Sequence, residues 1–152
     1  MRKKIIYIFY LTCLILISNC GYTPIYSSQD LELNFKKIDY KNTKLNNQIA
    51  RSLKSFSNNN GSKIYQIQID TNKFKEVISK DSKGNPETLE LKIILDLEIT
   101  DQDNVFKKTF KNKLNYSDNA NKFELSQYEG EIEKQIIDSL IKDIINYLLN
   151  LK

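Results

Sequence analysis

Apolar and polar side chains alternate through several segments of this chain, which is the pattern of β-strands that bury one face. The clearest run covers residues 89–99, where only Ile94 breaks the alternation. The run that begins at residue 63 continues irregularly through residues 74–78. Together these runs predict four strands, at residues 31–35, 63–71, 89–99 and 106–116. The first run falters at Lys36 and resumes out of phase at Ile38, which indicates either a β-bulge or an early end of this strand.

Two further segments repeat apolar residues every three or four positions, which is the period of an α-helix. The first follows Asn42 and Thr43, either of which can cap it. The second begins near Phe123 and continues to the end of the chain. Gly130 lies inside this second segment, and we expect it to mark either a kink or a later start of the helix.

The predicted order is strand, helix, three strands and helix. One face of the sheet is apolar along its length, and both helices carry a matching apolar stripe, so we expect the helices to cover that face. The fold class is therefore α+β, a two-layer sandwich of a four-stranded sheet with two helices packed on one face. We expect residues 31–152 to form this single domain.

The N-terminus has the features of a secretory targeting signal. Three basic residues precede an apolar run at residues 5–17, which is shorter than the roughly 20 residues that span a bilayer. The run ends at Ile17-Ser18-Asn19-Cys20, which resembles a bacterial lipobox, with Asn19 where Gly, Ala or Ser is usual. This predicts a signal peptide at residues 1–19, lipid attachment at Cys20, and an acylated tether at residues 20–30. A buried helix, a permanent anchor or a free thiol at Cys20 are the alternatives.

Composition narrows the function further. The sequence has no His, which removes the bases that activate most nucleophiles, so we expect no enzyme, no metal site and no cofactor. Removing the three basic residues at the N-terminus leaves 23 − 3 = 20 basic against 19 acidic residues. The remaining domain is nearly neutral, which argues against nucleic acid as a partner.

Three lysines share one face of the fourth predicted strand: Lys107, Lys111 and Lys113. Lysines on an edge strand often guard the edge against pairing with other chains. Alternatively, these three side chains form a platform for the phosphate or carboxylate groups of an anionic glycolipid such as lipopolysaccharide.

The segment "CGYTPIY", residues 20–26, resembles the start of the outer-membrane lipopolysaccharide-assembly lipoproteins (LptE/RlpB-like), in particular the alphaproteobacterial ones. The segment "LNYSDNANKFELSQYE" before and within the last helix is similar to the same family. The resemblance implies a non-enzymatic lipoprotein of the outer membrane, on its periplasmic side or in the lumen of a large β-barrel translocon. There it would plug and support the barrel and assist lipopolysaccharide insertion at the outer leaflet.

A second interpretation remains open from the sequence. A periplasm-facing lipoprotein that binds a lipid or small ligand for an ABC-type transport system would have the same N-terminus and a similar small domain. An anchored enzyme is a third interpretation, which the absence of His and of a nucleophile–base pair disfavours.

Overall fold

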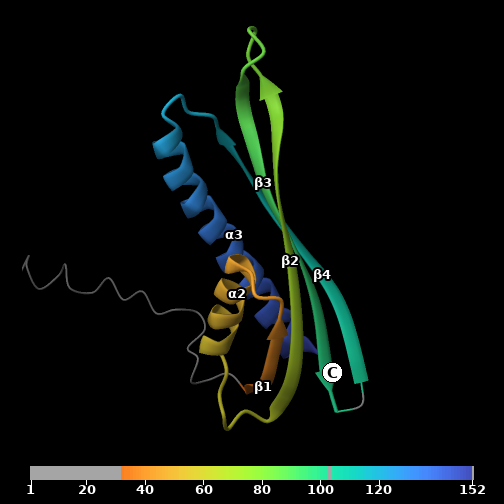
Figure 1. Cartoon of the computed structure of the whole chain (residues 1–152). Helices are drawn as coiled ribbons and strands as arrows, with labels where there is room; N and C mark the ends of the chain where they lie inside the picture. The colour runs from red at the N-terminus through yellow and green to blue at the C-terminus, as the bar shows by residue number, and fades with distance from the viewer. Residues whose placement is uncertain (1–31, 103, 152) are drawn as a thin grey trace, which may run out of the picture.

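A computed structural model describes residues 32–102 and 104–151 of the chain (Figure 1). The predicted signal peptide, Cys20 and the tether lie outside the described residues. The elements are β1 (Leu33–Tyr40), α2 (Lys44–Ser55), β2 (Lys63–Lys80), β3 (Pro86–Asp101), β4 (Asn104–Ser117) and α3 (Lys122–Asn150).

The four strands form one sheet in the order β1-β2-β3-β4. β1 runs parallel to β2, and the other two pairs are antiparallel. A parallel pair needs a crossover connection, and α2 supplies it. Both helices lie on the same side of the sheet (Figure 1). The predicted α+β class with the order β-α-β-β-β-α is therefore confirmed.

The core lies between β3 and the two helices. Every second residue of β3 from Leu89 to Ile99 is buried, as the alternation predicts, and faces the helix layer. α3 contributes most of the opposing side chains, and α2 adds Ile49 and Leu53 above β1 and β2. The fully buried members of this core include Ile93, Leu95, Ile99, Ile136, Ile137, Leu140 and Ile144.

Each helix begins at a side-chain cap. The Thr43 hydroxyl accepts a hydrogen bond from the Asn46 amide, and the Asn121 side chain accepts bonds from the amides of Phe123 and Glu124. These caps satisfy amide groups that the first helical turn leaves without partners. The cap of α3 places its start at Lys122, so the helix passes through Gly130 and a late start at that residue is wrong. The single glycine costs about 1 kcal/mol, which the buried apolar stripe of a long helix offsets.

β1 contains the predicted bulge, because its register with β2 shifts between Phe35 and Lys37. β2 differs from the sequence expectation. Instead of becoming irregular after residue 71, it remains a strand to Lys80 because it pairs with β3 along this whole length. Small register shifts occur only near its end, around Ser79.

The two layers have different lengths. α2 begins beside β2, where the Thr71 hydroxyl donates a hydrogen bond of 2.5 Å to the Oδ1 atom of the buried Asn46. From there α2 returns toward the start of β1, and β1 itself pairs no further along β2 than Ile69. The part of β2 from Thr71 to Lys80, which we call the β2 arm, therefore extends beyond both β1 and α2 (Figure 1).

Replacing Leu95 with Asp tests the central contact of the core. Leu95 is fully buried in β3, and a carboxylate there would lose its hydration without gaining a partner. We expect a loss of unfolding free energy of about 4 kcal/mol or more. Asn72→Asp, on the exposed face of β2, is the control and should change stability little. Chemical denaturation followed by circular dichroism measures both variants, and equal stability of the two would contradict the proposed core.

Candidate functional site

The three predicted lysines of β4 lie on the face of the sheet that the helices leave open. Across the β3–β4 register, Lys107 stands opposite Glu98, Lys111 opposite Ile94, and Lys113 opposite Lys92. The apolar residues of β4 alternate with them and face the helices. β4 is also an edge strand of the sheet, as the edge-guard interpretation requires.

Two of these three lysines are held by carboxylates of β3. Lys107 Nζ lies 2.9 Å from Glu98 Oε2, and Lys113 Nζ lies 2.6 Å from Glu90 Oε2. The Glu90 side chain is only 5% exposed, whereas that of Lys113 is 59% exposed. Such cross-strand pairs stabilise a sheet and partly neutralise the lysines. Lys111 is exposed and has no ion-pair partner within residues 32–102 and 104–151.

The same open face carries a further pair between β3 and β2. Lys92 Nζ lies 3.0 Å from Glu76 Oε1 and 5.4 Å from the centre of the Phe74 ring. Phe74 is 42% exposed on this face, and the ammonium group of Lys92 covers part of its ring. The open face is therefore polar and largely balanced in charge, with Lys111 as a cation that remains available.

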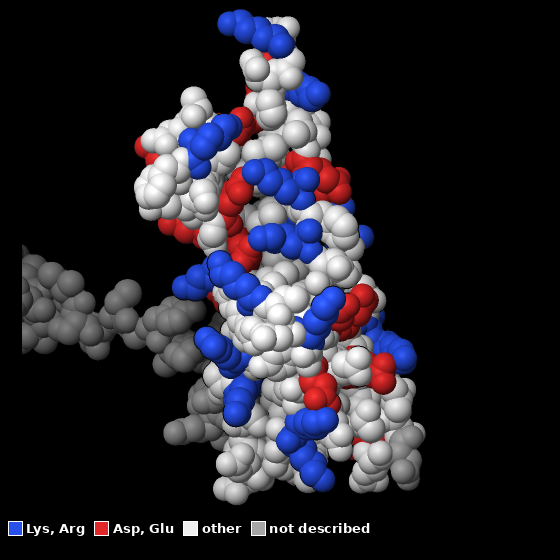
Figure 2. Space-filling model, viewed as in Figure 1, with Lys and Arg blue, Asp and Glu red and all other residues white. Residues whose placement is uncertain are grey.

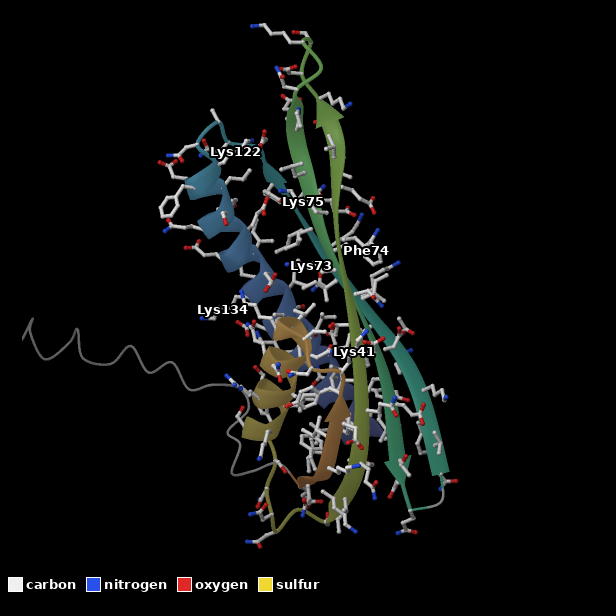
Figure 3. All side chains as sticks on the ribbon, in the orientation of Figure 1. Lys41, Lys73, Phe74, Lys75, Lys122 and Lys134 are labelled. Carbon is white, nitrogen blue, oxygen red and sulfur yellow. The ribbon has the colours of Figure 1, made fainter. Side chains whose placement is uncertain are left out.

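A second group of lysines lies on the helix side of the sheet, on the β2 arm. Lys73 and Lys75 point from β2 toward α3, whereas Phe74 points away from it (Figure 3). Lys73 Nζ lies 2.7 Å from Glu133 Oε2, and Lys75 forms an ion pair with Glu129. Because α2 no longer covers β2 here, long side chains with charged ends occupy positions that apolar residues fill lower in the strand.

Glu129 is the centre of a small polar network between sheet and helix. It also accepts a hydrogen bond of 2.8 Å from the hydroxyl of Tyr116, a buried residue of β4. Burial by itself would raise the pKa of Glu129, but the bonds from Lys75 and Tyr116 and the charge of Lys73 lower it overall. Burial, followed by the bond to Glu129 and the nearby negative charges, raises the pKa of Tyr116. Glu129 is thus ionised and joins β2 and β4 to α3.

Basic side chains continue along this face of the molecule. Figure 2 shows blue atoms following one another along most of its length, with red atoms beside them. Lys41, Lys122 and Lys134 lie on this face together with the two arm lysines (Figure 3). Lys122 pairs with Asp118 at 2.8 Å, whereas Lys41 and Lys134 have no ion-pair partner within the described residues.

Exposed apolar side chains lie on the β2 arm and at the start of α3. Val77 and Ile78 lie on the β2 arm, and Phe123, which is 71% exposed, lies in the first turn of α3. No local pattern of the sequence predicts this surface, because its residues come from segments far apart in the chain. The irregular apolar positions at residues 74–78 were the signal that could have found it, since they lack a partner layer.

Other kinds of site receive no support from the described residues. Within them, no group of three or more His, Cys, Asp or Glu side chains could hold a metal ion. Neither helix of the described chain combines the length and the apolarity needed to cross a bilayer. A hollow of about 670 Å³ lies at the end of the sheet where β2 begins, and its lining includes Lys63, Tyr65 and Asp101.

Glu129→Gln tests the network between β2, β4 and α3. At neutral pH we expect a loss of about 1 kcal/mol of unfolding free energy, because Tyr116 and Lys75 lose a charged acceptor. The folded-state pKa of Glu129 is lowered, so its contribution is complete above the ordinary value of 4.5 and is lost as the pH falls through the folded value. The difference from the wild type should shrink in that range.

Glu131→Gln is the matched control for this prediction. Glu131 lies on the same helix, is exposed, and has no ion-pair partner within the described residues. Denaturant titrations at neutral and acidic pH compare the three proteins. Equal stability of the two variants at neutral pH would show that Glu129 does not support the fold in this way.

Comparison with known proteins identifies the fold. No protein-family model matches the chain, and no curated protein sequence matches it. Similar solved structures include rare lipoprotein B from Shewanella oneidensis, with a TM-score of 0.55 and 11% identity over 75% of this chain and 97% of that one. A putative lipoprotein from Caulobacter crescentus CB15 has a TM-score of 0.56 and 12% identity over 77% and 87% of the two chains.

A third similar structure is that of an uncharacterized lipoprotein B from Nitrosomonas europaea, with a TM-score of 0.52 and 14% identity over 76% and 83% of the two chains. Since all three identities are low, the likeness concerns the fold. Almost the whole length of the Shewanella protein is covered, so the correspondence involves the complete domain rather than one motif. The chain has the fold of rare lipoprotein B.

Proposed function

We propose that this chain is a non-enzymatic outer-membrane lipoprotein that supports and plugs the β-barrel translocon for lipopolysaccharide. The observation that carries the proposal is the fold shared with several lipoproteins, joined to a lipobox-like Cys20 and the following "GYTPIY". The motif lies outside the described residues, so the fold and the motif are separate observations.

The arrangement of the domain suits attachment at one end. β1 begins opposite Lys63, the first residue of β2, whereas the β2–β3 turn lies at the other end of the sheet. A lipid on Cys20 would therefore be connected to the end of the domain remote from the β2 arm. The arm, with its exposed apolar and basic side chains, would extend away from the point of attachment and remain available to a barrel wall or to lipopolysaccharide.

The β2 arm and the open face of the sheet each offer groups that could bind lipopolysaccharide. Lipopolysaccharide presents phosphate groups next to acyl chains, and a surface that combines lysines with apolar side chains complements both. On the β2 arm, Val77 and Ile78 are about half exposed, at 46% and 52%. On the open face, Lys111 supplies a cation that no carboxylate of residues 32–102 and 104–151 pairs with.

Purification of the tagged full-length chain from its native outer membrane tests the partner. We expect a large β-barrel protein to co-purify, and lipopolysaccharide with it. Mass spectrometry of the purified sample identifies both. Recovery of the chain alone, or with a bound lipid and no barrel, would contradict the proposal and favour the ligand carrier of an ABC-type system.

Lys111→Glu tests the predicted contact with lipopolysaccharide. Lys111 is preferable to Lys107 and Lys113, because reversing either of those charges would also break an ion pair within the sheet. We expect lipopolysaccharide binding to weaken by about threefold to tenfold through the loss of a charge-assisted bond. Lys142→Glu, the same change on the exposed side of α3, is the control. Equal binding by both variants would show that Lys111 does not contact lipopolysaccharide.

A further inference from the structure

We propose that the groove between β1 and α2 binds an extended acidic segment of a partner protein, which adds to the free edge of β1 as a strand. This groove has a volume of about 320 Å³, and its lining includes Phe35, Lys36, Ile38, Ala50, Arg51 and Lys54. It lies on the opposite edge of the sheet from the β4 lysines. The inference does not depend on the identity of the barrel partner proposed above.

The outer edge of β1 has backbone groups that can pair with another strand. This edge is covered only near its start, where Leu33 O accepts a bond of 2.7 Å from the Asn58 amide and the Phe35 amide donates to Ser57 Oγ at 2.9 Å. Within the described chain, no loop bonds to the outward backbone groups of residues 36–40. An edge with free amide and carbonyl groups is a template for another strand.

The direction of these backbone groups follows from the faces of the strand. In a strand of fixed direction, residues that share a face also turn their amide and carbonyl groups toward the same edge. Phe35, Ile38 and Tyr40 lie beside Tyr65, Ile67 and Ile69, which all face the helices. Since the Phe35 amide points outward, the amides and carbonyls of Ile38 and Tyr40 point outward as well.

The side chains that line the β1–α2 groove make it basic. Lys36, Arg51 and Lys54 have no ion-pair partner within residues 32–102 and 104–151, and no Asp or Glu lines the groove. Lys37, which also lines it, pairs with its neighbour Asp39 at 2.8 Å, but both side chains are more than half exposed. The groove therefore combines several cations with no acidic side chain in its lining.

The other lysine groups of the domain differ from this one. Lys73 and Lys75 are held by glutamates of α3, and Lys107 and Lys113 by glutamates of β3. Those lysines have structural partners within the same chain. Within residues 32–102 and 104–151, Lys36, Arg51 and Lys54 of the β1–α2 groove have no such partner, so an external carboxylate would complete their pairing.

Arg51 strengthens the case for a carboxylate ligand. The sequence contains only two arginines, and the other, Arg2, lies in the predicted signal peptide. The planar guanidinium of arginine can donate two parallel bonds to one carboxylate, which lysine cannot do. Arg51 is exposed on α2 beside the buried Ala50, whose small side chain leaves room for an approaching segment.

The apolar lining and the strand edge favour a peptide over a lipid headgroup. Phe35 and Ile38 are partly buried, and Tyr40 is 40% exposed at the end of the groove. An added strand would place alternate side chains against these residues and against the cations of α2. A headgroup would pair with the cations but would leave the outward amides of Ile38 and Tyr40 without partners.

Two synthetic peptides test this inference with the full-length chain in detergent. In the first peptide glutamate alternates with valine, and in the second glutamine replaces every glutamate. Fluorescence anisotropy should detect binding of the first peptide and much weaker binding of the second. Hydrogen exchange should show new protection of the Ile38 and Tyr40 amides only when the glutamate peptide is present.

Charge reversal then locates the site. In the double variant Arg51→Glu and Lys54→Glu, we expect affinity for the glutamate peptide to fall about tenfold or more. The matched control reverses two exposed lysines outside the groove, Lys44 and Lys142, and should bind as the wild type does. Circular dichroism verifies that both double variants are folded.

Four results would overturn the inference. Equal binding of the two peptides would exclude charge recognition, and equal binding by the two double variants would exclude this groove. Binding to phosphatidylglycerol vesicles that depends on Arg51 and Lys54, without binding of the glutamate peptide, would assign the groove to a lipid headgroup instead. Protection of the Ile38 and Tyr40 amides in the chain alone would mean that the edge is already occupied.

Discussion

The contact between the apolar face of β3 and the stripe of α3 is the interaction on which the rest of the fold depends. β3 is the longest regular alternation in the chain, and its buried residues are opposed by fully buried residues of α3 such as Ile137 and Leu140. Burying one such side chain contributes about 1.5–3 kcal/mol, so this contact supplies much of the driving force for folding. β2 and β4 gain their places by pairing with the two edges of β3, and β1 by pairing with β2.

A mismatch between the layers explains most of the polar features. The sheet is longer than the area that α2 covers, and the buried Asn46 marks the limit of that cover by its bond with Thr71. Beyond this point α2 no longer covers β2, and β1 no longer pairs with it. Its helix-facing positions therefore hold Lys73 and Lys75, whose charges reach glutamates of α3, and its remaining apolar residues stay exposed. The β2 arm, which extends beyond α2 and β1, is therefore the surface that we propose contacts the barrel and lipopolysaccharide.

The lysines of this domain fall into distinct physical groups even though they look alike in the sequence. Those of β4 mostly neutralise carboxylates of β3, and those of the β2 arm neutralise carboxylates of α3. Lys36, Arg51 and Lys54 are different, because they have no ion-pair partner within the part of the chain that the structure describes. The β4 lysines therefore find most of their carboxylate partners within the chain, whereas the β1–α2 groove would find them on an acidic partner. β4 and β1 form opposite edges of the sheet.

The sequence by itself determined the elements whose physical cause is local. Period-two and period-four patterns predict the strands and helices, Thr43 is one of the two predicted caps, and the change of phase at Lys36 indicates the bulge. The motif at Cys20 likewise rests on adjacent residues alone. Only the tertiary structure decided the extent of β2, the passage of α3 through Gly130, and the partners of each lysine. These depend on pairing and packing between segments far apart in the chain, and no local pattern of side chains records such distances.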